Sequence, residues 1–284
     1  MLYTDEHLHG LFTPPSAQDS KYTRGVVGLV TGSEEYPGAG VLSVSAAASC
    51  GAGYVRYSGP STVVQALLGL HPEVVFSASS HNHVDCWVLG SGYADARSNL
   101  LIDEIIRNLD AQYAVIDAGA LEGFTTMDLS DEQRAHCVLT PHTGEAARVF
   151  SALGHARSAQ ECADNPEDTA QSLARLLGCT MVLKGAQTVV SDGCETFVCP
   201  PATHWLATAG TGDVLAGLMG GVIAQHAQEL RAQQYNLVRI AAAAVRVHSV
   251  AAHIASGQGE HALNLLDMTK LIPQSIAQLK GSAA

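Results

Sequence analysis

The chain has 284 residues, of which 47% are hydrophobic and 15% are charged, so it can bury a large core. Its formal net charge of −12 disfavours nucleic acid as a partner, because nucleic-acid-binding proteins usually carry a basic patch and none is visible here. The amino-terminal segment MLYTDEHLHGLF lacks the basic start and the apolar run of a signal peptide.

Strand-like and helix-like runs alternate along the chain. Short apolar runs predict strands at 25–31, 54–57, 74–76, 86–89, 114–116, 138–139 and 180–183, then a hairpin of 188–191 and 195–198 joined by Asp-Gly. Helical spacing predicts helices at 41–49, 99–109, 145–153, 168–177, 212–226 and 235–255, and a last helix near 266–279. The polar stretch 151–167 predicts a surface connection. We therefore expect an α/β fold, one domain over 1–284, with a central, mostly parallel sheet flanked by helices on both faces.

Two features bear on the compartment. The apolar stretch VRIAAAAVRVHSVAAHIA is interrupted by Arg239, Arg246 and His248, so it falls short of a membrane span and no membrane partner is expected. The seven cysteines have irregular spacing and no CxxC pair, which indicates buried free thiols in a reducing compartment. The sequence therefore predicts a cytoplasmic protein.

Glycine-rich or polar turns follow several predicted strands. Any one of them could be an ordinary strand-end turn, but ligands of open α/β sheets bind beyond the carboxyl ends of the strands, and the recurrence favours a shared cleft. Neither GxxxxGK[ST] nor a GxGxxG after a strand occurs, which excludes a P-loop enzyme and a standard dinucleotide-binding domain. The turns are Gly32-Ser33, Gly90-Ser91-Gly92, the run Thr140-Pro141-His142-Thr143-Gly144-Glu145, and Lys184-Gly185-Ala186-Gln187-Thr188.

The segment ATAGTGDVLAG predicts a glycine-rich turn that opens a helix. The backbone N–H groups of Gly210, Thr211 and Gly212 would form an anion hole. Asp213 could merely complement the helix dipole, worth ~0.3–1 kcal/mol. The dipole would keep this carboxylate ionised, which suits a base, and a base beside an anion hole matches phosphoryl transfer. We favour the catalytic interpretation.

Three further side chains have two interpretations each. Lys184, one of four lysines, is either a solvated residue at a strand end or a cation near nucleotide phosphates. His142 is either packed in its loop or in contact with substrate. Glu145 either sits in a first helical turn capped by Thr143 or helps to hold a hydrated Mg²⁺. The pairs His7–His9 and His81–His83 lack a third zinc ligand and are expected to be surface histidines.

Taken together, these motifs resemble one family, the ADP/ATP-dependent NAD(P)H-hydrate dehydratases, which have a ribokinase-like fold. The resemblance runs from about Lys21 to the carboxyl-terminal helices. It rests on GSEEYPGAGVLSVSAAASCGAG, VLGSG, VIDAGAL, TPHTGE, VLKGAQT and ATAGTGDVLAG.

The resemblance implies repair of a nicotinamide cofactor in which water has added across a ring double bond. ADP or ATP, with Mg²⁺, would phosphorylate the hydroxyl of the hydrate NAD(P)HX, and loss of phosphate would restore NAD(P)H. Ala39, Gly92 and His142 would contact the hydrate, and Asp213 would be the base. Gly212 and the turn Lys184, Gly185, Ala186, Gln187 and Thr188 would contact ADP or AMP. The family also implies a homo-oligomer, with a tetramer as the expected form, and the apolar carboxyl-terminal helices could face another subunit.

The sequence departs from the family pattern at two places. Gly119 stands where many members have a second aspartate, which puts the role of that loop in doubt. Thr203-His204-Trp205 replaces a frequent Asn-Pro-Gly, and Trp205 either packs on the adenine or belongs to the core. Bifunctional members carry an epimerase domain ahead of this one, so an epimerase is expected to act separately.

Two other functions remain open on the sequence alone. A small-molecule kinase of the same fold, acting on a vitamin precursor or a sugar, would use the same Asp213 and stop at the phosphate ester. A non-catalytic nucleotide-binding protein would not need Asp213. The motifs YPGAG and TPHTGE argue against the kinase, and the intact GTGD turn argues against the binding protein.

Overall fold

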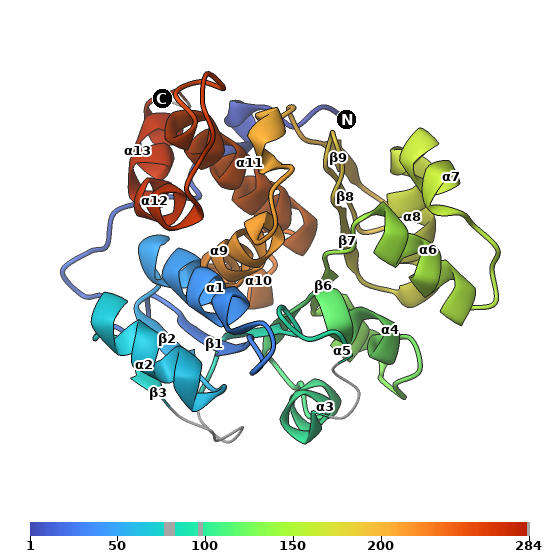
Figure 1. Ribbon diagram of the computed structural model, residues 1–284, viewed down its shortest axis with the longest axis horizontal. Helices are drawn as coiled ribbons and strands as arrows, with labels where there is room; N and C mark the ends of the chain where they lie inside the picture. The colour runs from blue at the N-terminus through green and yellow to red at the C-terminus, as the bar shows by residue number, and fades with distance from the viewer. Residues whose placement is uncertain (77–82, 96–98, 283–284) are drawn as a thin grey trace.

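The computed structural model describes residues 1–76, 83–95 and 99–282, and a nine-stranded sheet runs through it (Figure 1). The strand order is β3-β2-β1-β4-β5-β6-β7-β8-β9. Neighbours pair in parallel from β3 to β7, and β8 and β9 close the sheet as an antiparallel hairpin. The strands are β1 (Val26–Val30), β2 (Tyr54–Tyr57), β3 (Val75–Phe76), β4 (Cys86–Leu89), β5 (Tyr113–Ile116), β6 (Cys137–Leu139), β7 (Thr180–Leu183), β8 (Val189–Ser191) and β9 (Thr196–Val198).

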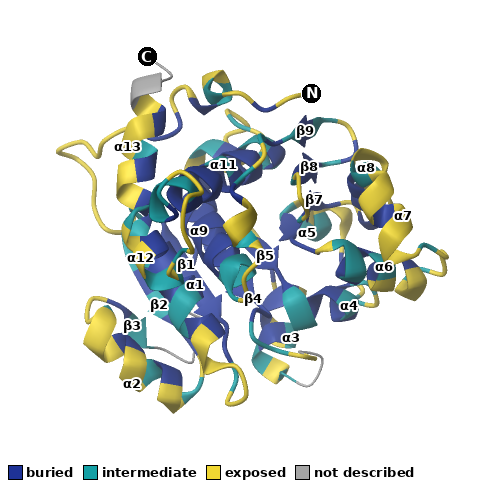
Figure 2. Cartoon of the chain, turned by 45° about the horizontal axis from the view of Figure 1, so that its top comes forward, coloured by how far each residue is buried: buried dark blue, intermediate teal, exposed yellow. Residues whose placement is uncertain are grey.

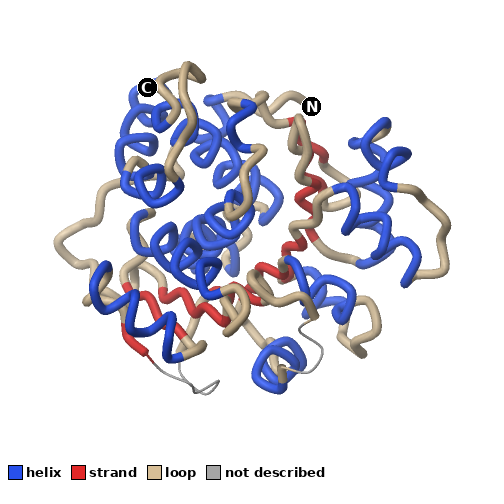
Figure 3. Tube along the Cα trace, viewed as in Figure 1, coloured by secondary structure: helices blue, strands red, loops and turns tan. Residues whose placement is uncertain are grey.

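Helices cover both faces of this sheet, as Figure 3 shows for the red strands between two groups of blue helices. Each face has its own hydrophobic cluster, since successive side chains of a strand point to opposite faces. The expected α/β fold with a mostly parallel, doubly covered sheet is confirmed. The helices are α1 (Pro37–Ser49), α2 (Ser61–Leu70), α3 (Leu100–Arg107), α4 (Leu121–Phe124), α5 (Asp131–Ala135), α6 (Thr143–Ala152), α7 (Ala159–Asp164), α8 (Pro166–Leu177), α9 (Thr211–Gln225), α10 (Ala227–Arg231), α11 (Leu237–Ala255), α12 (Leu265–Lys270) and α13 (Ile272–Ser282).

Three helix predictions are wrong in ways that local chemistry explains. Helix α1 begins four residues earlier than expected, because Pro37 occupies its first turn, where a missing N–H costs nothing. The stretch 151–167 is not only a connection, since Ser158 and Glu161 form a capping box that starts α7. The last segment consists of two helices, α12 and α13, rather than one.

Helix α11 corrects the expectation that no apolar stretch reaches the length of a membrane span. Leu237–Ala255 is long and apolar enough by length and composition, with a mean hydropathy of 1.3 in its best window. However, 72% of that window is buried within the protein. Figure 2 shows α11, together with α9, largely in the colour of buried residues at the centre of the molecule. Its arginines bind the amino-terminal segment: Arg246 lies 2.7 Å from Asp5, and Arg239 donates to the His7 carbonyl at 2.8 Å. This is the pattern of a core helix.

The cysteines follow the expectation with one exception. All seven are free thiols, and six of them are buried. Cys194, in the turn between β8 and β9, is exposed, so the prediction of burial is wrong for this residue.

Helices α1 and α9 lie unusually close together on one face of the sheet. A Cβ on Gly217 would collide with the Ser43 carbonyl, and one on Gly221 would collide with the Cys50 sulfur. On the sheet side, a Cβ on Gly220 would collide with a methyl group of Val88. Glycines in α9 therefore let it fit between α1 and β4, and this contact fixes where the first turn of α9 lies.

Gly217→Ala should destabilise the protein by about 1–3 kcal/mol, because the added methyl group must push α1 and α9 apart. The matched control is Gly69→Ala in α2, where an added Cβ meets nothing within 4 Å. That change should stabilise by up to ~1 kcal/mol through helix propensity. Urea denaturation midpoints measure both effects. Equal midpoints for the two variants would contradict the close α1–α9 contact.

Candidate active site

The strand-end turns converge at the carboxyl edge of the sheet. The N–H of Gly32, after β1, donates to the Ser91 carbonyl, after β4, at 2.8 Å. Gly92 packs against Ala39 of α1, so closely that a Cβ on Gly92 would lie 2.6 Å from the Ala39 Cβ. Farther along the edge, the N–H of Lys184 donates to the Pro141 carbonyl at 2.8 Å, which joins the turns after β7 and β6. The expected shared edge is thus present in the structure.

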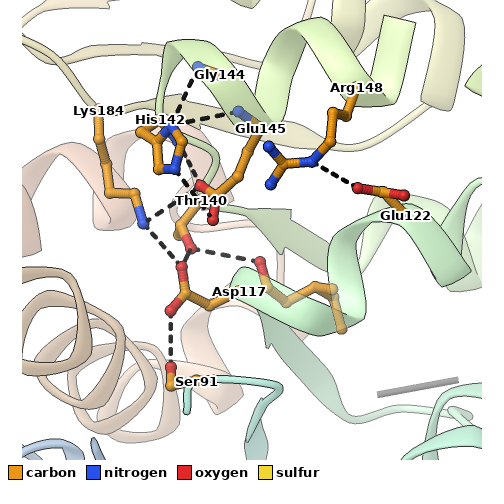
Figure 4. A network of polar contacts seen from close by, with 10 residues as sticks. Ser91, Asp117, Glu122, Thr140, His142, Gly144, Glu145, Arg148 and Lys184 are labelled. Carbon is orange, nitrogen blue, oxygen red and sulfur yellow. Dashed lines mark hydrogen bonds and ion pairs between the residues drawn. The ribbon is translucent and has the colours of Figure 1, made fainter. Parts of the chain in front are cut away.

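A buried ion pair lies at the centre of this edge (Figure 4). Lys184 Nζ donates to Asp117 Oδ1 at 2.9 Å, and Asp117 also accepts from the Thr140 hydroxyl at 2.7 Å and the Ser91 hydroxyl at 2.8 Å. Burial alone would raise the pKa of Asp117, but the Lys184 charge and these hydrogen bonds hold it below its ordinary value. The Lys184 side chain is only 19% exposed, so its interpretation as a solvated strand-end lysine is wrong.

Glu145 extends this network and is bound to His142. The His142 N–H donates to Glu145 Oε2 at 2.7 Å, and the ring Nδ1 of His142 accepts from the N–H groups of Gly144 and Glu145. This is a capping box in which His142 caps helix α6, and not Thr143 as one of the two interpretations of Glu145 had it. Glu145 Oε2 lies 3.9 Å from Lys184 Nζ. The carboxylates of Asp117 and Glu145 therefore both face the Lys184 ammonium group.

The predicted glycine-rich turn opens α9. Gly210 caps the helix with φ +96°, a left-handed conformation that suits glycine. Gly212 is already helical, and what it provides is space, because a Cβ there would lie 3.3 Å from Lys184 Nζ. In the described part of the chain, the N–H groups of Gly210, Gly212 and Asp213 have no hydrogen-bond acceptor, whereas Thr211 N–H reaches the Thr208 carbonyl at 3.4 Å. The first turn of α9 thus presents free donors, as an anion site requires.

The charge state of Asp213 differs from the expectation that the helix dipole keeps it ionised. Burial, reinforced by the nearby negative charge of Asp117 and opposed by Lys184, raises the pKa of Asp213 to about 7. The dipole is too weak to offset the loss of hydration. A pKa near the working pH is the value at which a carboxylate serves best as a general base.

A cavity of about 480 Å³ adjoins this turn. It contains most of the residues predicted to contact the nucleotide, and its opposite wall comes from the segment 200–207 and from α11. Gln187 does not line it, and its side chain donates to the Cys199 carbonyl instead. The lining residues are His142, Lys184, Gly185, Ala186, Thr188, Pro200, Ala202, Thr203, His204, Leu206, Ala207, Thr211, Gly212, Leu215, Val245, His248 and Ser249.

One of the two departures from the family pattern, at Gly119, has a local explanation. A Cβ on Gly119 would collide with the Tyr93 carbonyl, so a second aspartate could not occupy this position without moving the turn after β4. Trp205 is 42% exposed and donates from its indole N–H to the Gly259 carbonyl at 2.9 Å, so it is not a core residue. Its neighbours Thr203 and His204 line the cavity.

The histidine pairs show no sign of metal binding in the described ranges. No cluster of three or more histidine, cysteine, aspartate or glutamate side chains occurs there that could hold a metal ion. His9 is exposed as expected, whereas His7 stacks on Tyr3 at 5.0 Å between ring centres. His81 lies outside the described residues, and its neighbour His83 faces Asp85 at 3.4 Å.

Asp117 and His248 are polar residues of this site that sequence reasoning misses. Asp117 directly follows β5, as the other candidate turns follow their strands, so its position in the sequence could have marked it as a site residue. No such sequence signal marks His248, because it lies within an apolar helical run. Its ring faces the first turn of α9, 3.1 Å from the Thr211 carbonyl.

Comparisons with known proteins agree on one family. The family model described as NAD(P)H-hydrate dehydratase matches residues 27–274. The chain is 36% identical over 217 residues to the bifunctional NAD(P)H-hydrate repair enzyme Nnr of Mycobacterium tuberculosis, covering 74% of this chain and 43% of that protein. It therefore spans less than half the length of that relative. It is 32% identical to the ADP-dependent (S)-NAD(P)H-hydrate dehydratase of Neisseria meningitidis, covering 79% of this chain and 78% of that protein.

Solved structures share the fold. The ADP/ATP-dependent NAD(P)H-hydrate dehydratase of Bacillus subtilis, co-crystallised with ATP and Mg²⁺, superposes with a TM-score of 0.85 and 23% identity over 98% of both chains. A ribokinase-like superfamily protein of Enterococcus faecalis superposes with a TM-score of 0.83 and 22% identity, over 98% of this chain and 95% of that one. The expected ribokinase-like fold is confirmed.

Asp117→Asn should cost about 3–5 kcal/mol of stability, because it leaves the Lys184 ammonium group without its closest partner. The control is Asp267→Asn, which breaks an exposed pair with Lys270 and should cost no more than ~1 kcal/mol. Chemical denaturation measures both. A loss at Asp117 as small as that at Asp267 would show that the buried pair contributes little.

Asp213→Asn should stabilise the protein increasingly as the pH rises. Because the folded-state pKa of about 7 lies above the ordinary 3.8, ionising Asp213 disfavours the folded state. This penalty is absent below pH 3.8, grows as the pH rises, and is complete above about 7, and the uncharged amide of the variant would not carry it. Melting temperatures of both proteins between about pH 5 and about pH 8 test this. A constant difference across that range would refute the raised pKa.

Proposed function

The chain belongs to the NAD(P)H-hydrate dehydratase family, and from this premise we propose that it converts (S)-NAD(P)HX to NAD(P)H at the expense of ADP or ATP. One observation carries the proposal. The first turn of α9 carries free N–H groups and the half-buried Asp213, and Thr211 and Gly212 of this turn line a cavity that is large enough for a nucleotide.

The first step is phosphoryl transfer. Asp213 takes the proton of the ring hydroxyl, whose oxygen forms a bond to the terminal phosphorus of ADP, while the bond from phosphorus to the AMP oxygen breaks. The N–H groups of Gly210, Gly212 and Asp213 stabilise the phosphoryl group in transit. Thr211 belongs to the predicted anion hole, but its N–H already reaches the Thr208 carbonyl. The Lys184 ammonium group, held by Asp117 beneath this turn, adds positive charge.

The second step is elimination. The lone pair of the ring nitrogen expels phosphate by breaking the carbon–oxygen bond, and loss of a proton from the neighbouring ring carbon restores the double bond. The products from ADP are NAD(P)H, AMP and inorganic phosphate. No second acid is needed, because phosphate is a good leaving group, and this agrees with a site that offers one carboxylate of near-neutral pKa beside a carboxylate of low pKa.

Substrate contacts are assigned on the same basis. The turn Lys184–Thr188 and Gly212 would hold the nucleotide, as the shared cavity supports for all of them except Gln187. Ala39 and Gly92, which pack against each other at the carboxyl edge of the sheet, would hold the hydrated ring. His142 lines the nucleotide cavity, so we place it between the two substrates.

Magnesium would be held mainly by the nucleotide phosphates and water, with Glu145 as an outer partner. Both oxygens of Asp117 already accept hydrogen bonds, whereas Oε1 of Glu145 meets only the His142 ring among the described residues, at 3.5 Å. Magnesium that keeps several waters needs only one or two carboxylates. When bound, it supplies positive charge to the phosphates.

Other expectations stay predictions: a single domain over 1–284, a cytoplasmic location, an epimerase that acts separately, and a homo-oligomer such as a tetramer. Met268, Ile272 and Leu279 of the carboxyl-terminal helices are buried within the chain itself, so an interface on these helices would use their remaining, exposed faces.

The test is to incubate the protein with Mg²⁺, hydrated NADH, and either ADP or ATP, and to follow the return of NADH absorbance. We expect full turnover by the wild-type protein and a loss of at least ~100-fold in kcat for Asp213→Asn, with nucleotide affinity retained. Asp267→Asn is the control and should keep its activity, because it removes only an exposed ion pair on α12.

Three outcomes would contradict the proposal. No return of NADH with either nucleotide would exclude dehydration of the hydrate. A stable phosphate ester formed from another alcohol would identify a small-molecule kinase instead. Unchanged turnover in Asp213→Asn would remove Asp213 as the base.

A further inference from the structure

Helix α11 places one polar ring against the catalytic turn. His248 is 6% exposed and lines the cavity, and its Nε2 lies 3.1 Å from the Thr211 carbonyl oxygen. A carbonyl oxygen only accepts hydrogen bonds, so Nε2 carries the proton and donates it. Burial, together with the positive charge of Lys184, lowers the pKa of His248 to about 4, so the ring is neutral at physiological pH.

The contact acts on a turn that has few restraints of its own. Gly210, the cap of α9, has no side chain with which to hold the helix start. Thr211 is held instead, because its hydroxyl donates to the Leu206 and Thr208 carbonyls at 3.0 Å each, and its carbonyl accepts from His248. Thr211, which precedes Gly212 and Asp213, is therefore held by two segments. One is the stretch that contains Leu206 and Thr208, and the other is α11.

A histidine at this position is costly unless it has a partner. Val247 and Ala251, two of its neighbours along α11, are buried and apolar, and a buried polar ring without a hydrogen bond destabilises a protein. An aliphatic side chain would fill the same volume without that cost. The hydrogen bond to Thr211 is a contact that such a side chain could not make.

We propose that His248 is a positioning residue for phosphoryl transfer, whose Nε2–H fixes the Thr211 carbonyl and so aims the N–H groups of Gly212 and Asp213 at the phosphoryl group. The inference rests on the proposed function for the identity of the reaction. It does not make His248 an acid or a base, since the ring neither gains nor loses a proton.

The test compares His248→Met, which removes the donor, with His248→Gln, whose amide N–H reaches about as far as Nε2. Vanadate, which mimics a phosphoryl group in transit, is titrated by calorimetry in the presence of AMP. We expect His248→Met to bind vanadate at least ~10-fold more weakly, with AMP affinity within ~3-fold of wild type, and His248→Gln to restore most of the loss. His226→Met is the control, because His226 is equally buried but lies at the other end of α9.

Turnover gives the second readout. In the hydrate assay, kcat should fall for His248→Met and recover for His248→Gln, while the pH dependence set by Asp213 keeps its midpoint. Equal vanadate binding by His248→Met and wild type, equal losses in the Met and Gln variants, or an equal loss in His226→Met would each overturn the proposal. So would a wild-type protein that does not bind vanadate, since no phosphoryl site would then exist to be positioned. Vanadate binding with no hydrate turnover would instead overturn only the proposed function.

Discussion

The close contact between α1 and α9 is the constraint on which the site depends. Glycine at 217 and 221 lets α9 lie against the backbone and sulfur of α1, and Gly220 lets it lie against β4. These contacts fix the position of α9 against α1 and β4. Its first turn therefore lies at the carboxyl edge of the sheet. Every other part of the site is arranged around that turn: the Lys184 ammonium group near Gly212, the cavity beyond it, and His248 across from it.

Two aspartates in the same site have opposite electrostatic environments. Asp117 is buried with a lysine and two hydroxyl groups, and its pKa lies below the ordinary value. Asp213 is half-buried and accepts no such hydrogen bonds from the described residues, and its pKa rises to about 7. Environments that separate the pKa values of two neighbouring groups are typical of sites that assign them different tasks. Here Asp117 holds Lys184 in place and remains charged, and Asp213 is left able to exchange a proton.

The parts of the molecule that can be predicted from sequence are those with a local signal. Apolar runs of four residues locate β2, β4 and β7 without error, and Asp-Gly locates the hairpin. The turn at Gly210 is found because glycine and a following helical pattern mark a helix start. The partners of Lys184 are not found, since a contact with Asp117 across 67 positions leaves no mark on either local sequence. The contact of His248 with Thr211 likewise leaves no mark on the local sequence. The raised pKa of Asp213 cannot be predicted either, because it depends on burial by distant segments.

The His142 cap shows a subtler limit. A capping box normally uses serine or threonine, so Thr143 is the natural choice one residue away. The structure uses an imidazole nitrogen as the acceptor and keeps Glu145 at the usual third position. The choice also directs a ring into the cavity, which a threonine cap would not do.

The central claim is that the hydroxyl oxygen of the hydrate is phosphorylated before it leaves. Hydrated NADH carrying oxygen-18 in that hydroxyl tests this most directly, by mass spectrometry of the phosphate released during turnover with ADP. One labelled oxygen is expected in the phosphate, because the oxygen stays bonded to phosphorus when the carbon–oxygen bond breaks. Label found in water, with unlabelled phosphate, would mean that the nucleotide is hydrolysed separately and would contradict the claim.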